Sequence, residues 1–179
     1  MSTAISFELD DGIGAGLDAF EDEILAQVVR PTARAGALVF YGEARRLAPV
    51  YDGPPVPGVN PGQLRDSIYH VHVPEHSTDQ RHEYRVSWNH AKAPHGWLIE
   101  YGHWRVNKVN LVNGFWEFTK ERLPEPVWVP AHPYIRPAAA AGGRAIDAMR
   151  NRMRERLAEI LAGGAVSYGS TAGSVARTA

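Results

Sequence analysis

The sequence contains no cysteine among its 179 residues, which excludes disulfides, thiolate nucleophiles and zinc or iron sites with sulfur ligands. No apolar run approaches the roughly 18 residues that a membrane-spanning helix requires. The N-terminal sequence MSTAISFELDD lacks the basic and apolar regions of a signal peptide. We therefore expect a soluble protein that is made in a cytoplasm and has no membrane partner.

The chain also has little net charge. Nineteen basic residues nearly balance twenty acidic ones, and the formal charge is −1. Such a balance produces no overall field that would attract nucleic acid or an anionic membrane, although it leaves room for a local basic patch. Hydrophobic residues make up 44% and charged residues 22%, which is typical of a soluble globular protein with one domain.

Two segments show the apolar spacing of helices. The first begins at Leu17 and stops before Pro49, and Pro31 within it predicts a kink or a break. The second begins at Gly143 and is expected to end at Gly163-Gly164. The apolar positions of the two stripes are Leu17, Phe20, Ile24, Val28, Ile146, Met149, Met153 and Leu157. We interpret residues 1–16 as an N-terminal arm and residues 163–179 as a flexible C-terminal tail.

The middle of the chain favours antiparallel strands. Residues 68–73 and 83–88 alternate between apolar and polar side chains, and the polar stretch 74–82 is typical of a hairpin connection. Residues 49–62 hold five prolines and three glycines and predict an irregular loop. Residues 97–102 are compatible with a short helix or a strand, and 103–129 with a long excursion containing one or two strands. Strands grouped between helices predict a single α+β domain over residues 17–162, with an antiparallel sheet flanked by the two helices.

Histidines provide the first candidate for chemistry. His70 and His72 share one face of a predicted strand, and His76, His82 or His90 could add a third metal ligand. With Glu100 they would suggest a metal-dependent hydrolase. The spacing matches no defined metal motif, so we favour histidines at the surface or the edge of the core.

Other candidates are weaker. Glu100 lies beside Trp97 and Tyr101, where burial could raise the pKa of its carboxyl for acid–base work. We favour a carboxylate satisfied by backbone donors or an arginine. Asp66-Ser67 lacks a Gly-x-Ser-x-Gly elbow, and the glycines at 12–16 lack the spacing of a phosphate-binding loop. The sequence therefore predicts no catalytic residue, no cofactor and no metal. Five arginines of the last helix favour a solvated face or a subunit contact: Arg144, Arg150, Arg152, Arg154 and Arg156.

Three segments carry a resemblance when they are taken in order. The first is Ala48-Pro49-Val50 followed, after a loop, by GQLRDSI at 62–68. The second is WLIEYGH at 97–103, and the third is PAHPYIRPA at 130–138, which leads into the last helix. This order resembles the tail-component or neck-protein family of long-tailed phages, whose members are described as tail completion or head–tail joining proteins. In that family APVxTGxLRxSI, xxEFGT and PAxPFLRPA recur before a terminal helix.

The resemblance covers roughly residues 17–162, with some departures. The loop after Pro49 is longer here, Tyr101 and Tyr134 stand where phenylalanine is usual, and His103 replaces a threonine or serine. These substitutions are chemically mild. The matching positions, which we interpret as fold and assembly residues, are Pro49, Gly62, Leu64, Ser67, Glu100, Gly102, Pro133, Arg136 and Pro137.

The resemblance implies a structural virion protein without enzymatic activity. Such a protein forms a ring of six or twelve identical copies at the head–tail junction, and it is assembled in the cytoplasm of a bacterial host. Its partners are itself, the head-closure or portal-side connector proteins, and the tail terminator or tail tube protein, with possible DNA contact in the lumen. A tail terminator that caps the tail tube is the alternative within virion proteins. Arg136 is expected to pair with Glu100 or with a carboxylate of an adjacent subunit.

Overall fold

The computed structural model describes residues 11–56, 60–78 and 80–169. The expected α+β class is confirmed. In chain order the elements are α1 (Asp11–Leu47), α2 (Gln63–Ser67), β1 (Ile68–Thr78), β2 (Arg81–Trp88), α3 (Gly96–Tyr101), β3 (His103–Val112), β4 (Phe115–Val129), a 3₁₀ turn (Pro137–Ala141) and α4 (Gly142–Gly169).

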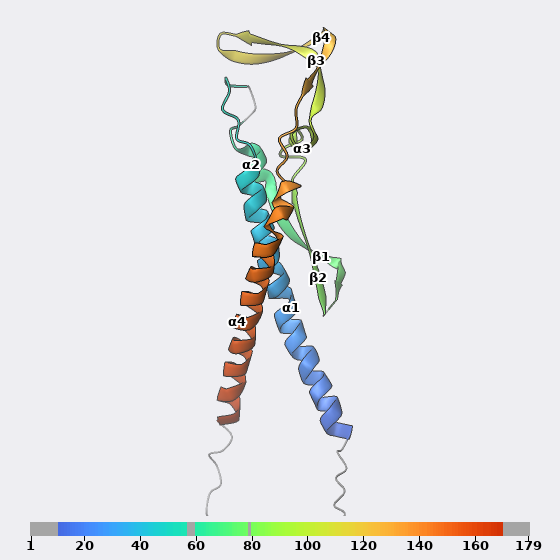
Figure 1. Ribbon diagram of the computed structural model, residues 1–179, viewed down its shortest axis with the longest axis vertical. Coiled ribbons are helices and arrows are strands. Elements are labelled where there is room, and N and C mark those ends of the chain that lie inside the picture. The colour runs from blue at the N-terminus through green and yellow to red at the C-terminus, as the bar shows by residue number, and fades with distance from the viewer. Residues whose placement is uncertain (1–10, 57–59, 79, 170–179) are drawn as a thin grey trace, which may run out of the picture.

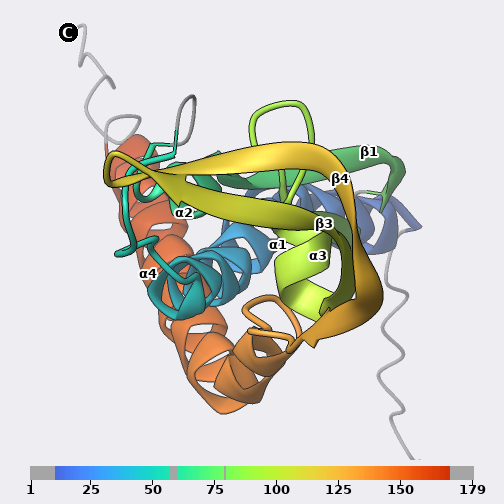
Figure 2. The same cartoon turned by 90° about the horizontal axis from the view of Figure 1, so that it is seen from above.

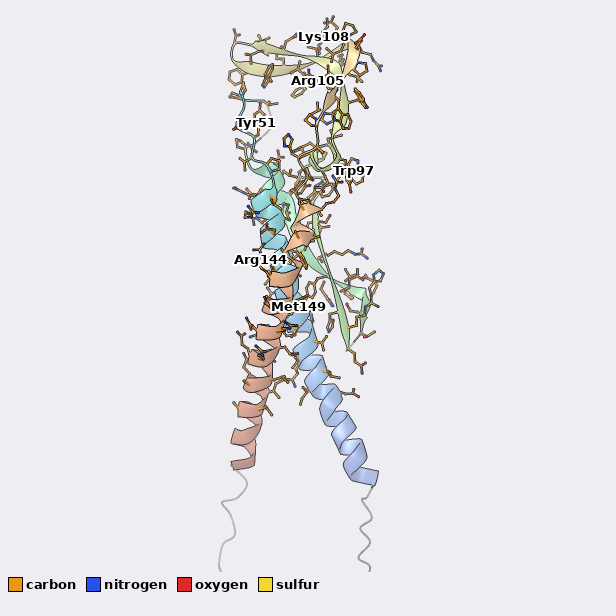
Figure 3. All side chains as sticks on the ribbon, in the orientation of Figure 1. Tyr51, Trp97, Arg105, Lys108, Arg144 and Met149 are labelled. Carbon is orange, nitrogen blue, oxygen red and sulfur yellow. The ribbon has the colours of Figure 1, made fainter. Side chains whose placement is uncertain are left out.

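The long helices α1 and α4 run antiparallel and form an elongated body (Figure 1). They lie together at their upper ends and diverge toward the start of α1 and the end of α4. Small side chains permit the close approach, since Ala37 of α1 and Ala145 of α4 are both buried. Met149 lies on the part of α4 that packs against α1 (Figure 3).

A carboxylate also joins the two helices. Glu43 of α1 accepts hydrogen bonds from Arg46 at 2.6 Å and from Arg144 of α4 at 2.7 Å. Hydrogen bonding to Arg46, followed by that to Arg144, lowers the pKa of the Glu43 carboxyl to about 2. Glu43 therefore stays ionised at any ordinary pH and keeps the end of α1 next to the start of α4.

Two predicted boundaries of the helices were wrong. α1 begins at Asp11, so the glycines at 12–16 are helical and do not form a loop. Of the kink or break predicted at Pro31, the break does not occur, because α1 is continuous through this residue. α4 continues past Gly163-Gly164 to Gly169, because a glycine costs a helix only about 1 kcal/mol and alanines flank this pair. The remainder of the predicted arm and tail, residues 1–10 and 170–179, lies outside the described residues.

The strands form two separate hairpins where one sheet was expected. β1 and β2 pair from Ile68↔Trp88 to Val73↔Glu83, with an irregularity before Thr78. This hairpin packs along α1. The predicted strands at 68–73 and 83–88 are therefore confirmed, and most of the predicted connection is itself extended strand.

The second hairpin, β3–β4, accounts for the excursion at 103–129. Its turn consists of Asn113 and Gly114, both with positive φ, as tight hairpin turns require. The pairing changes abruptly from Arg105↔Val127 to Asn107↔Arg122, so β4 has extra unpaired residues where Pro124 and Pro126 lack backbone donors.

The outer part of this hairpin consequently turns and crosses the top of the molecule, above the loop that precedes α2 (Figure 2). There the Trp116 amide donates to the Pro55 carbonyl at 3.2 Å.

The main core lies where the upper end of α1 meets the middle of the chain. It joins residues from four separate stretches of the chain, namely Ala44, Ala48, Leu64, Ile68, Ala93, Tyr134 and Ala138. None of the helices in the described ranges combines the length and the apolar composition needed to cross a membrane.

Gly102 provides a test of how β3 leaves the core. Its φ of 74° and ψ of 168° belong to a region that only glycine readily adopts. A Cβ there would lie 2.8 Å from the Val129 carbonyl oxygen and 2.7 Å from the Trp128 ring. We expect Gly102→Ala to lower the free energy of unfolding by about 3 kcal/mol, measured by urea denaturation.

Gly114→Ala is the matched control. Gly114 also has a positive φ, but nothing lies within 4 Å of the position of its Cβ. The control should cost only the backbone strain of about 1 kcal/mol. Equal losses in the two variants would show that the close approach at Gly102 does not matter.

Candidate functional site

The centre of the site is the carboxylate of Glu100, which lies near the end of α3. Glu100 is only 1% exposed to solvent. One oxygen, Oε2, accepts hydrogen bonds from the backbone amides of Tyr134 at 2.8 Å and Ile135 at 3.0 Å. The other, Oε1, accepts from the amide of Arg136 at 3.1 Å and from its Nε at 3.0 Å. We call these four residues the Glu100 cluster.

Arg136 closes the cluster from its solvent side. Its Nη2 donates to the carbonyl oxygen of Glu100 at 2.7 Å, and its guanidinium lies 4.6 Å from the centre of the Tyr101 ring. A further backbone bond runs from the His132 amide to the Ile99 carbonyl at 2.8 Å. The segment before the 3₁₀ turn is thereby fixed along α3. The predicted pairing of Arg136 with Glu100 is confirmed.

The surroundings of Glu100 keep it ionised. Burial alone would raise the pKa of its carboxyl, but hydrogen bonds from the amides of Tyr134, Ile135 and Arg136 and from the Arg136 side chain outweigh burial. The pKa therefore lies below the ordinary value for a glutamate. With both oxygens occupied by protein donors, this carboxylate is suited to holding a backbone segment and not to transferring a proton.

Tyr134 connects the cluster to the core. Its side chain is fully buried, and its ring meets that of Trp88 edge to face at 5.9 Å. Burial, reinforced by the negative charge of Glu100, raises the pKa of the Tyr134 hydroxyl. The tyrosine thus remains neutral and serves as an apolar anchor.

The first motif meets the other two at this core. Gly62, with a φ of 81°, turns the chain into α2, and Leu64 of α2 is buried in the core. The hydroxyl of Ser67 donates to the Leu64 carbonyl at 2.7 Å, and the Ser67 carbonyl accepts from the Asn89 amide at 2.9 Å. Ser67 is therefore a structural residue at the junction of α2 and β1.

The three motif prolines lie at the ends of elements. Pro49 follows α1 after one residue, Pro133 precedes Tyr134, and Pro137 occupies the first turn of the 3₁₀ segment, where its missing donor costs no hydrogen bond. The structure thus brings the three sequence motifs, which are separated by up to 90 residues of chain in the printed sequence, around one core.

The histidines do not assemble with Glu100. His72 Nε2 lies 3.0 Å from His82 Nδ1, His70 packs edge-on against Tyr41, and His76 pairs with Glu83 at 3.0 Å. Within the residues that the structure describes, no three histidine or carboxylate side chains are grouped so that they could hold a metal ion.

The β3–β4 hairpin carries an exposed apolar surface. It has solvent-exposed large side chains along most of its length, with Trp104 63% and Phe118 70% exposed. The others are Val106, Leu111, Val112, Phe115, Val127 and Trp128. Among the other tryptophans, Trp88 packs against the core, whereas Trp97 of α3 is exposed (Figure 3). The feature of the sequence that could have revealed this surface is the mixture of apolar and charged residues on both faces of 103–129.

A groove of about 530 Å³ lies beneath the hairpin. Its walls include Val50 and Tyr51 of the loop, Ile99 of α3 and Phe118 of β4, with His95 among them. Burial lowers the pKa of the His95 imidazole, so this side chain is neutral at pH 7. The groove suits an apolar side chain better than an ion.

Comparisons of the chain with protein-family models, with curated proteins and with solved structures find no match.

The Glu100 cluster yields a prediction for stability. Glu100→Gln places an NH₂ group among donors and removes the charge that Arg136 faces, so the free energy of unfolding should fall by about 3 kcal/mol in urea at pH 7. Glu75→Gln, at an exposed carboxylate, should change it by less than about 0.5 kcal/mol. A Glu100→Gln variant as stable as the Glu75→Gln control would refute the role of the cluster.

The same variant should alter the dependence of stability on pH. Because the pKa of Glu100 is lowered on folding, its contribution is complete above about pH 4.3, the ordinary glutamate value, and is lost as pH falls through the lower folded value. Acidification below pH about 4 should therefore destabilise Glu100→Gln less than the wild type. An identical loss in both proteins would contradict this assignment.

Proposed function

We propose that this chain is a structural subunit of the neck of a tailed bacteriophage. It forms a homo-oligomeric ring that joins the DNA-filled head to the tail. One face of the ring meets the head-closure or portal-side proteins, and the other meets the tail terminator or the tail tube. In this proposal the protein acts by assembly, has no catalytic residue, and resides in the virion after assembly in the bacterial cytoplasm.

The observation that carries the proposal is the meeting of the three motifs at one core. Glu100 of the second motif binds the amides of Tyr134, Ile135 and Arg136 in the third, and Leu64 of the first shares a core with Tyr134. These contacts provide a physical reason why the three motifs should occur together and in order. They support the resemblance as one of fold, because chance matches would have no reason to converge.

The exposed surfaces support assembly with other subunits. An isolated two-stranded hairpin is marginally stable in water, yet β3–β4 stands away from the helices with its apolar side chains exposed. On α4, Ile146 and Leu161 are also exposed. Apolar surface on this scale is typical of sites where other chains bind. Within a ring, each hairpin would reach a neighbouring subunit.

Loss of the protein from a phage that encodes it tests the proposal. Full heads and separate tails in electron micrographs of the lysate are the expected result. Overlong tails would instead indicate a tail terminator, the alternative function. Normal infectious particles would contradict both functions. Complementation with the wild-type gene is the control.

The contribution of the hairpin can be tested on the purified full chain. Phe118→Ser removes its most exposed aromatic side chain, and truncation of an interface aromatic commonly costs about 2 kcal/mol per contact. We expect the wild type to form oligomers in native mass spectrometry and Phe118→Ser to shift toward smaller species. Tyr69→Ser, at an exposed tyrosine of β1, is the control and should leave the distribution unchanged. Equal distributions for wild type and Phe118→Ser would exclude the hairpin from the interface.

A further inference from the structure

A second groove, of about 680 Å³, lies between α1, α4 and the β1–β2 hairpin. Its walls include Arg30 and Arg34 from α1, Arg152 from α4, and His70, His72 and Tyr84 from the strands. None of the residues that line it is acidic. Three long elements that are distant in sequence thus direct cationic and hydrogen-bonding groups to one depression.

Two of the three arginines have no counterion within the described part of the chain. Arg30 and Arg34 are exposed and stand one helical turn apart on α1, so they present a pair of guanidinium groups on the same side of the helix. Arg152 is different, because it pairs with Glu155 at 2.9 Å and Glu159 at 3.3 Å on its own helix. The unneutralised positive charge of the groove therefore comes from α1.

The strand side of the groove supplies imidazole and phenol groups. His72 is held by His82 and packs against Tyr84, with ring centres 5.2 Å apart. The Nδ1 atom of His70 is buried without a hydrogen-bond partner among the described residues. Imidazole and phenol groups can both donate hydrogen bonds, so this side of the groove is compatible with a ligand that brings oxygen atoms.

We infer that this groove binds phosphate groups of a nucleic acid backbone. Guanidinium groups match phosphate oxygens in geometry as well as charge, and imidazole and phenol groups add hydrogen bonds of the kind that fix a backbone without reading its sequence. The groove is too large for one phosphate ion, which favours a chain of phosphates. The near-zero net charge of the chain is compatible with this, because the positive charge is local.

The inference rests on the proposed function for its setting, since DNA passes from head to tail through the neck. Its chemistry can be tested without that setting. The affinity of the purified full chain for a short fluorescein-labelled DNA duplex of mixed sequence is measured by fluorescence anisotropy between about 50 and 200 mM salt. Inorganic phosphate is added as a competitor in a parallel titration.

Arg30→Gln/Arg34→Gln should lower the affinity for DNA about ten-fold at the low salt concentration. Loss of two phosphate contacts should also reduce the slope of log affinity against log salt by about two. The matched control is Arg150→Gln/Arg154→Gln, an exposed pair with the same spacing on α4 that does not line the groove. It removes the same charge and should change affinity less than about two-fold. Unchanged melting temperatures would show that all variants fold.

Several outcomes would overturn the inference. Equal weakening by the two double variants would show that only total charge matters. Absence of binding to both DNA and inorganic phosphate would exclude a phosphate site. Poly-glutamate is a further competitor. If it displaces the DNA at a far lower concentration of negative charge than phosphate does, the groove is a site for an acidic protein segment. If phosphate competes at millimolar concentration and the DNA binds more tightly than phosphate, the result supports a site for the nucleic acid backbone. None of these results decides whether heads and tails separate when the protein is missing, so the two proposals can fail independently.

Discussion

The carboxylate of Glu100 is the interaction on which the arrangement of the chain depends. It lies in a nearly dry position and is tolerated there only because three consecutive amides and one guanidinium satisfy its oxygens. The same bonds determine where the chain turns into the 3₁₀ segment and hence where α4 begins. α4 then packs antiparallel to α1, so the Glu100 cluster and the Glu43–Arg144 pair together position the start of the long helical body.

The remaining structure is organised around a small core and extended elements. Alanines dominate the buried set, so α1 and α4 approach closely but bury few large side chains. The large apolar residues are instead distributed over β3–β4, α3 and the outer face of α4, where they are exposed. A chain with this distribution gains stability by burying the exposed groups against other chains. This is the physical basis for proposing a subunit of an assembly.

The sequence predicted the parts of this structure that depend on local patterns. The strands at 68–73 and 83–88, the C-terminal end of α1 and the start of α4 followed from periodicity and from Pro49. A carboxylate satisfied by backbone donors or an arginine was the favoured interpretation of Glu100, and the structure has both kinds of donor. Residues 12–16 and 163–164 were mispredicted because glycine disfavours a helix only weakly when neighbouring residues continue it. The groove that contains Arg30 and His70 could not be predicted in this way. These two residues are 40 positions apart in the sequence, and local patterns do not show which distant residues come together in the fold.

A reconstruction of the head–tail junction of the virion by cryo-electron microscopy tests the central claim most directly. We predict a ring at the junction whose repeating density fits the antiparallel pair α1–α4, with each β3–β4 hairpin in contact with a neighbouring copy. Purified, infectious virions that lack this protein, or density for it elsewhere in the particle, would contradict the account.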